Sequence, residues 1–179
     1  MAAPLAVAAQ ENPMRRIRIG KVVVNISVGK SGEPLEKAAR VLQDITGHKP
    51  SRRRAKKTIK NFGIRKGEPI SCMVTLRGGD AEAFLRRALD AVGRRLKQSS
   101  FDEEGNISFG LKEHIEIPGV KYDPELGIYG MDITVNLERP GYRVKRRRRC
   151  PSDIGKTHKI TRGEADKFME EAFSVQIGG

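Results

Sequence analysis

The chain has 179 residues, enough to bury one ordinary core, and 35 lysines and arginines against 22 aspartates and glutamates give it a net charge of +13. So basic a surface repels itself unless a polyanion neutralises it, which favours nucleic acid or an anionic membrane as the partner. No run approaches the roughly 20 apolar residues of a spanning helix, and Cys72 and Cys150 offer neither a disulfide framework nor metal-ligand spacing. We therefore expect a reduced, cytoplasmic protein with no membrane role.

The first residues are apolar but do not form a signal peptide. They lack a basic start, are short, and run into Glu11 and Pro13. We predict that residues 1–12 are a disordered leader and that residues 13–179 form a single domain.

Alternating residues predict a first strand over residues 17–28, with Val22, Val24 and Ile26 on one face and Asn25 on the other. A helix should follow, because Pro34 suits a first turn and Gly47 suits a helix end. Its apolar stripe at helical spacing consists of Leu35, Ala38, Ala39, Leu42 and Ile45. This helix should pack on the apolar face of the strand.

Residues 49–60 are a basic stretch with little to bury. The basic members are Lys49, Arg52, Arg53, Arg54, Lys56, Lys57 and Lys60. Only Ala55 and Ile59 are apolar, so we predict an exposed loop that leads into a short strand and is mobile in the free protein.

A second alternating strand is predicted over residues 70–77. Ile70, Cys72, Val74 and Leu76 would point inward, and Ser71, Met73, Thr75 and Arg77 outward. Asp80 should then cap a second helix that reaches about residue 96. Its predicted buried stripe consists of Phe84, Leu85, Ala88, Leu89, Val92 and Leu96.

Two further strands are predicted over residues 107–117 and 131–137, joined by a loop over residues 118–130. Residues 139–160 form a basic C-terminal segment with turn residues. Thr161 and Glu164 have capping-box spacing and predict a last short helix that carries Phe168, Met169 and Ala172.

These elements predict an α+β fold in which helices cover one face of a largely antiparallel sheet. The other face would be polar. Amides and hydroxyls there can bind ribose, base edges and phosphate, while the basic segments supply charge. The sequence therefore predicts an RNA-binding face.

Sites of other kinds find little support. Gly29, Lys30 and Ser31 look like the end of a phosphate-binding loop, but the glycine required five positions earlier is Val24. The three histidines, His48, His114 and His158, are scattered, so we predict no metal site and no cofactor.

The carboxylates Asp102, Glu103, Glu104, Glu113 and Glu116 fit a solvated turn and an ordinary polar strand face, so we predict no catalytic residue. Tyr122, Tyr129 and Tyr142 are few enough that core positions are favoured over stacking on bases. The run Lys145, Arg146, Arg147, Arg148 and Arg149 could be a nuclear-import signal or a solvated run. A second basic cluster and the net charge favour RNA contact instead.

Several segments resemble a known family. VVVNISVG, ITGHKP, NFGIRKGEPISCMVTLRG and FDEEGNISFGLKEH, followed by GIYGMDITVNLERPGY, resemble the fifth universal large-subunit ribosomal protein, whose eukaryotic counterpart is numbered eleven. The resemblance covers roughly residues 12–173. After Leu137 the sequence departs from the bacterial pattern and resembles the archaeal and eukaryotic branch.

The resemblance implies binding to 5S rRNA and large-subunit rRNA in the central protuberance, beside the other 5S-binding ribosomal protein. It also implies contacts with P-site tRNA and a small-subunit head protein. By matching motifs, Asn25, His48 and Thr75 would bind rRNA, and the basic run Arg52, Arg53, Arg54, Lys56 and Lys57 would face tRNA. We add Arg77 and residues 145–149 to the expected rRNA contacts.

Two other classes stay open. A free RNA chaperone would share the charge but bind many RNAs alike. A small α+β enzyme would need convergent titratable groups in a pocket, which the sequence does not display.

Overall fold

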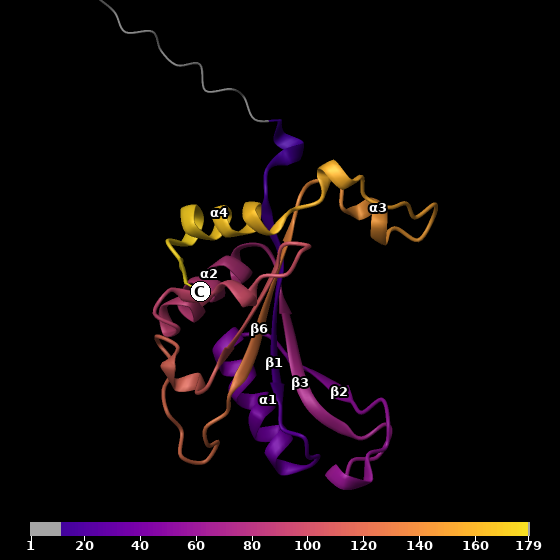
Figure 1. The fold of residues 1–179 in the computed structure, drawn as a ribbon. Coiled ribbons are helices and arrows are strands. Elements are labelled where there is room, and N and C mark those ends of the chain that lie inside the picture. Colours follow the sequence, from indigo (N-terminus) through magenta and orange to yellow (C-terminus); the bar gives the residue numbers. More distant parts are fainter. Residues whose placement is uncertain (1–11, 179) are drawn as a thin grey trace, which may run out of the picture.

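Five antiparallel strands form the main sheet of the computed structural model, which describes residues 12–178. They are β1 (Arg18–Ser27), β2 (Ser51–Arg54), β3 (Pro69–Leu76), β5 (Asn106–Leu111) and β6 (Met131–Glu138). Their order is β2-β3-β1-β6-β5, which places β1 at the centre (Figure 1). The predicted α+β class with a largely antiparallel sheet is confirmed.

Alternation along the central strand separates the two faces of the sheet as predicted. Val22, Val24 and Ile26 are at most 1% exposed, whereas Asn25 between them is half-buried on the other face. Because neighbouring strands are paired in register, residues opposite one another share a face. The apolar face thus extends across β3 and β6.

Two helices, α1 (Glu33–Thr46) and α2 (Gly78–Ala91), cover the apolar face of this sheet (Figure 1). α1 carries Pro34 in its first turn and ends at Gly47, whose φ of 70° suits a residue without a side chain. Its buried residues are Leu35, Ala38, Val41, Leu42 and Ile45. Ala39, predicted inside, is only partly buried, and Val41 takes the deeper position.

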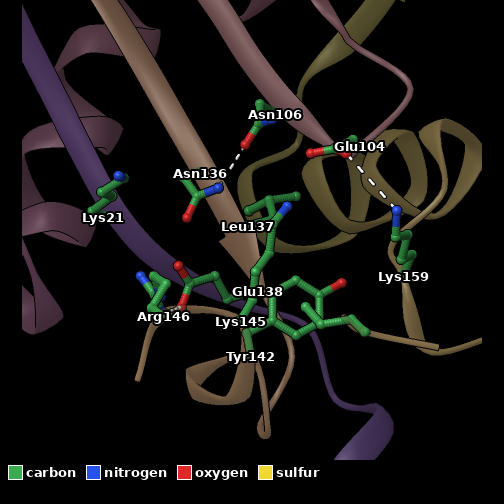
Figure 2. Close-up of a pocket in the computed structure, with 11 residues that line it drawn as sticks. Lys21, Glu104, Asn106, Asn136, Leu137, Glu138, Tyr142, Lys145, Arg146 and Lys159 are labelled. Atoms are coloured by element: carbon green, nitrogen blue, oxygen red, sulfur yellow. Dashed lines mark hydrogen bonds and ion pairs between the residues drawn. The ribbon is translucent and has the colours of Figure 1, made fainter. Parts of the chain in front are cut away.

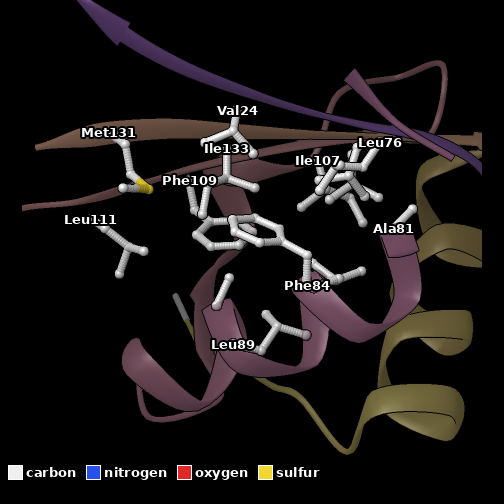
Figure 3. Packing of buried hydrophobic residues seen from close by; sticks show 14 of the residues in the cluster. Val24, Leu76, Ala81, Phe84, Leu89, Ile107, Phe109, Leu111, Met131 and Ile133 are labelled. Carbon is white, nitrogen blue, oxygen red and sulfur yellow. The ribbon is translucent and has the colours of Figure 1, made fainter. Parts of the chain in front are cut away.

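Phe84 of α2 is at the centre of the core beneath the sheet (Figure 3). It is 1% exposed and lies with Ile133 and Phe109 in one cluster of buried side chains. Burying a side chain of this size contributes about 1.5–3 kcal/mol. The packing of α2 therefore fixes the position of the strands whose other face stays open.

The second predicted helix is shorter than expected. It ends at Ala91, and Gly93 and Arg94 then adopt positive φ values of 68° and 54°. Leu96, predicted on the helix, is buried in the short strand β4 (Arg95–Lys97), which pairs in parallel with β7 (Gln176–Gly178). The helical spacing of apolar residues continues past Ala91, but the helical backbone ends there.

The strand predicted over residues 107–117 also ends early, at Leu111. His114 and Ile117 are still buried, but a single 3-10 turn, His114–Glu116, carries them inward. The loop over residues 118–130 is irregular, as predicted.

The last helix, α4 (Arg162–Phe173), begins at the predicted capping box of Thr161 and Glu164. Met169 is buried and Phe168 is partly buried, but Ala172 is exposed and Phe173 is buried in its place. The predicted leader lies outside the described residues except for Asn12.

Candidate nucleic-acid interface

The face of the sheet opposite the helices carries polar side chains in rows that cross the strands. We call it the open face, and its polar members include Lys21, Asn25, Ser27, Ser71, Thr75, Asn106, Ser108, Asp132, Thr134 and Asn136. Hydrogen bonds join strands along it: the Ser108 hydroxyl contacts that of Thr134 at 3.3 Å. Hydroxyl and amide groups suit ribose and phosphate oxygens.

Two of the predicted rRNA-binding residues lie close together on the open face. Asn25 is opposite Met73, and Thr75 is two residues further along the same strand. Thr75 is exposed, while the Asn25 amide donates to the Ser27 hydroxyl at 3.0 Å. The structure therefore brings these two side chains to one surface.

His48 and Arg77 lie near the end of β3. His48 follows α1, and its Nε2 is 3.1 Å from a carboxylate oxygen of Asp80 in the first turn of α2. The Arg77 guanidinium donates to the Gly20 carbonyl at 3.3 Å. Both side chains are exposed, but the contact with Asp80 places His48 beside α2 rather than among the open-face residues.

The prediction of an exposed loop is wrong for residues 51–54. They form the edge strand β2, in which Arg52 is opposite Cys72 and Arg53 is opposite Ser71. Because strand side chains alternate, these two arginines point to opposite faces. Arg52 lies on the helix side and pairs with Glu36 of α1 at 2.7 Å, whereas Arg53 shares the open face.

Residues 55–68 continue β2 as a hydrogen-bonded connection at the lower end of the sheet (Figure 1). The backbone N–H of Ala55 donates to the Glu68 carbonyl at 2.8 Å, and Ile59 and Ile64 form an isolated bridge. Lys56 and Lys57 are exposed there, and so is Phe62, at 73%. Sequence reasoning missed Phe62, although an aromatic beside Gly63 in a basic stretch was a usable signal.

The basic C-terminal segment leaves the opposite end of the sheet, after β6, and contains the short helix α3 (Arg143–Arg146) (Figure 1). Of its predicted contacts, Arg146 is partly engaged, since it donates to the buried Glu138 carboxylate at 2.8 Å. Arg147 donates to the Cys150 carbonyl at 2.7 Å. Lys145, Arg148 and Arg149 are exposed.

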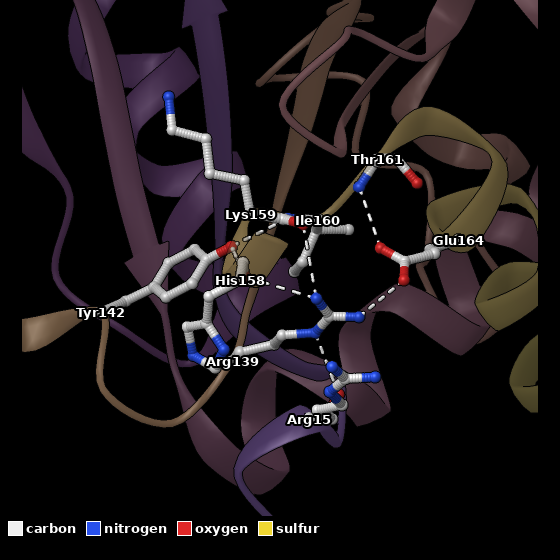
Figure 4. A network of polar contacts seen from close by, with 8 residues as sticks. All are labelled: Arg15, Arg139, Tyr142, His158, Lys159, Ile160, Thr161 and Glu164. Carbon is white, nitrogen blue, oxygen red and sulfur yellow. Dashed lines mark hydrogen bonds and ion pairs between the residues drawn. The ribbon is translucent and has the colours of Figure 1, made fainter. Parts of the chain in front are cut away.

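Arg139 anchors this segment from inside the protein (Figure 4). Its side chain is 7% exposed and donates to the Arg15 carbonyl at 3.0 Å, to the His158 and Lys159 carbonyls at 3.3 Å, and to Glu164 at 2.8 Å. Burial alone would raise the pKa of Glu164, but hydrogen bonds from Thr161 and Arg139 outweigh it and lower that pKa. The ionised pair is thus stabilised.

Two of the three tyrosines pack against the core as predicted, Tyr129 and Tyr142. Tyr122 is 54% exposed, so that prediction is wrong for it. The Tyr142 hydroxyl donates to the His158 carbonyl at 3.2 Å and accepts from the Ile160 N–H at 3.0 Å. Burial raises the pKa of Tyr142, which keeps its hydroxyl protonated.

A cavity of about 310 Å³ opens where the C-terminal segment folds back over the upper end of the open face (Figure 2). Lys21, Asn136 and Glu138 line it from the sheet, and Tyr142 and Lys145 line it from the segment. The cavity combines charged and amide groups, which suits a polar ligand.

Within residues 12–178, no three histidine, cysteine or carboxylate side chains come together as metal ligands. In the same part of the chain, no helix is both long and apolar enough to span a bilayer. Asp102 serves the backbone, since its carboxylate accepts from the N–H groups of Glu104 and Asn106 at 2.9 and 2.7 Å.

Two family models match the chain in succession. The model for ribosomal protein L5 matches residues 12–65, and the model for the ribosomal L5P family C-terminus matches residues 69–174. Large ribosomal subunit protein uL5 of Pyrobaculum aerophilum is 58% identical over 171 residues, which cover 96% of both chains. The uL5 proteins of Aeropyrum pernix and Nitrosopumilus maritimus are 57% and 49% identical, each over 93% of this chain and over 87% and 96% of their own.

The polar open face, the basic segments and these matches define a structural, RNA-associated ribosomal protein rather than an enzyme. Both family models and the high identity over nearly the whole chain indicate the same family. The chain belongs to the ribosomal protein L5 family and, within it, to the archaeal branch.

Proposed function

We propose that this chain is a structural constituent of the large ribosomal subunit in the cytoplasm and binds 5S rRNA and large-subunit rRNA in the central protuberance. Family membership and the relatives' names support the ribosomal role. The open face would hold 5S rRNA, and the basic surface around Lys56 and Lys57 at the lower end of the sheet would contact P-site tRNA.

One observation carries the proposal: a polar sheet face has a basic segment at each end. β1 runs from Arg18 at the upper end to Ser27 at the lower end, and β6 runs back. The C-terminal segment follows β6 at the upper end, and β2 leads into residues 55–68 at the lower end. Folded RNA presents ribose and phosphate groups that such a surface can bind.

The first experiment compares 5S rRNA affinity for the wild type and a triple variant, Asn25→Ala, Thr75→Ala and Arg77→Ala. The best-placed contact should contribute about 1–3 kcal/mol to binding. Arg95→Ala with Lys97→Ala is the control, because both side chains are exposed on β4, outside the main sheet. Equal affinity of the triple variant and the wild type would indicate that the interface lies at residues 145–149 instead of on the open face.

Salt dependence tests the electrostatic part of binding. Each neutralised phosphate releases counterions, so log K should fall against log salt with a slope of several negative units. Ribose and shape contacts should preserve preference for 5S rRNA at moderate salt. A flat response, or equal affinity for a DNA duplex of similar length, would contradict this.

The tRNA contact is tested by reversing charge at Lys56 and Lys57 to glutamate, and Arg53 is left unchanged because it lies on the open face. Arg52 is left unchanged, because a glutamate there would oppose Glu36. We expect 5S rRNA affinity of the isolated protein to be spared and tRNA binding by ribosomes carrying the variant to fall. Loss of 5S rRNA as severe as in the open-face variant would place this basic surface in the anchoring interface.

Two protein neighbours complete the proposal, the other 5S-binding ribosomal protein and a small-subunit head protein. Residues 112–130 support a protein contact, since they carry four carboxylates and two lysines in a chain of net charge +13. This acidic loop would attract a basic protein.

A free RNA chaperone is the alternative function. It would bind tRNA and 5S rRNA alike, because its affinity would come from charge alone. Competition between the two RNAs for the protein distinguishes the ribosomal function from the chaperone function. Efficient displacement of 5S rRNA by tRNA would favour the chaperone.

A further inference from the structure

The cavity at the upper end of the open face has the size and lining of a site for one small polar group (Figure 2). Its volume of about 310 Å³ lies at the lower end of the range of ligand pockets. Lys21 and Asn136 line it from the sheet, and Tyr142, Lys145 and Arg146 line it from the C-terminal segment. The site forms only because that segment folds back.

Asn136 presents a fixed hydrogen-bond acceptor to this cavity. Its amide nitrogen donates to Asn106 Oδ1 at 2.6 Å, and the Asn106 amide nitrogen donates to Asp102 at 2.6 Å. The Asp102 carboxylate also accepts from the N–H groups of Glu104 and Asn106, so Asn106 donates to it and both amides are held in this orientation. The Asn136 oxygen is therefore turned away from Asn106 and toward the space that the other labelled residues surround (Figure 2).

A second acceptor is the Glu138 carboxylate, whose side chain is 10% exposed. Gly20 makes room for it, because a Cβ there would lie 2.5 Å from Glu138 Cδ. Arg146 binds one carboxylate oxygen at 2.8 Å and holds the group in place. The cavity thus offers two acceptors on adjacent outward positions of β6.

Tyr142 and the lysines supply the remaining features of a nucleotide site. Tyr142 packs against the core and also lines the cavity, and hydrogen bonds to His158 and Ile160 fix its ring. A fixed aromatic wall suits stacking of a base. Lys21 and Lys145 supply positive charge for a phosphate. Guanine fits the acceptors best, because N1–H and the N2 amino group are adjacent donors, whereas uracil has one N–H between two carbonyls.

We propose that this cavity holds one unpaired guanosine nucleotide of 5S rRNA. The base lies toward Asn136 and Glu138, and the phosphate lies toward Lys145. This assignment rests on the proposed binding of 5S rRNA. If the polar network only docked the C-terminal segment, the cavity would have no affinity for nucleotides.

The test titrates the full-length, ¹⁵N-labelled protein with GMP, UMP or inorganic phosphate and follows amide signals by NMR. GMP should give saturable shifts around the cavity, including the Asn136 side chain, with half-saturation at millimolar concentration. Asn136→Ala should weaken the affinity for GMP about tenfold, equivalent to about 1.4 kcal/mol of binding free energy. Thr134→Ala, on the same strand and face, is the matched control and should leave GMP binding unchanged.

A second variant guards against misfolding of the first. Lys145→Ala removes an exposed charge on α3 and should weaken GMP several-fold without changing the melting temperature. In the wild type, 5S rRNA should displace GMP, and Asn136→Ala should lower 5S rRNA affinity about tenfold.

The outcomes separate this proposal from the broader one. If GMP causes no shifts, or if phosphate or UMP reproduces them, the nucleotide site is wrong even where 5S rRNA still binds the open face. If GMP binds and 5S rRNA does not displace it, the site takes a free nucleotide and the RNA assignment is wrong. If wild-type protein shows no preference for 5S rRNA, the proposed function fails, and with it the assignment of the nucleotide to 5S rRNA.

Discussion

Replacing Arg139 by alanine should strongly destabilise the protein, because its guanidinium is nearly inaccessible to water. The side chain is 7% exposed and has four acceptors: three backbone carbonyls and the Glu164 carboxylate. Removing one partner of a buried ion pair costs about 3–5 kcal/mol. The substitution would also leave a void between the start of the chain, the C-terminal segment and α4.

The structure favours the lower end of that range. Glu164 is 42% exposed and can be hydrated when Arg139 is removed, so we expect a loss of about 3 kcal/mol. For a chain of this length, such a loss lowers the melting temperature by about 6–12 °C. Because the pKa of Glu164 is lowered in the folded protein, its contribution is present above the usual carboxyl pKa and is lost as pH falls through the folded value.

Urea denaturation followed by circular dichroism measures the effect, and amide hydrogen exchange locates it. Exchange should accelerate over residues 139–160, since Arg139 holds that segment. Arg94→Ala is the control, because its ion pair with Asp90 is 50% and 41% exposed and should contribute less than about 1 kcal/mol. The loss of stability in Arg139→Lys should lie between the losses in Arg139→Ala and Arg94→Ala. Equal stability of the Arg139→Ala and Arg94→Ala variants would refute the reasoning.

Three further predictions concern buried groups. Burial lowers the pKa of His114, so the free energy of unfolding should fall as pH drops below about 6.5. His114→Asn should reduce the difference in that free energy between denaturation at pH 7.5 and at pH 5. Gly20→Ala should cost about 1–3 kcal/mol by displacing the neighbouring carboxylate, whereas Gly110→Ala, with no atom closer than 3.7 Å, should change the denaturation midpoint little. Burial raises the pKa of Cys72 to about 11, so a thiol reagent should label Cys150 quickly and Cys72 only on unfolding.

Sequence patterns were sufficient where burial alternates along a strand between two paired neighbours. Val22, Val24 and Ile26 identify the inner face of β1, and the same alternation by itself assigns Asn25 to the open face. Thr75 follows by the same rule on β3. Such positions are predictable because the period of a strand leaves only two faces to choose from.

Local patterns failed where distant segments decide the structure. Leu96 has the spacing of α2 but lies on β4, which pairs with the last strand of the chain. The cavity and the Arg139 network join residues that are up to 124 positions apart. No spacing rule within one element contains that information, because tertiary contacts override local propensity.

The basic edge strand was missed for a related reason. β2 has no buried apolar alternation, since all four of its residues are exposed. Charged edge strands are common because they discourage pairing with other chains, so a basic run is compatible with a strand as well as a loop.

That geometry changes what the charge can do. In a loop, Arg52 and Arg53 could reach the same phosphate backbone, but in β2 they point to opposite faces and Arg52 is paired with Glu36. Arg139 and Arg146 likewise bind carboxylates of the protein itself. Arginines engaged in this way release few counterions when RNA binds. The salt slope should therefore report fewer phosphates than a count of the basic residues in the two segments would suggest.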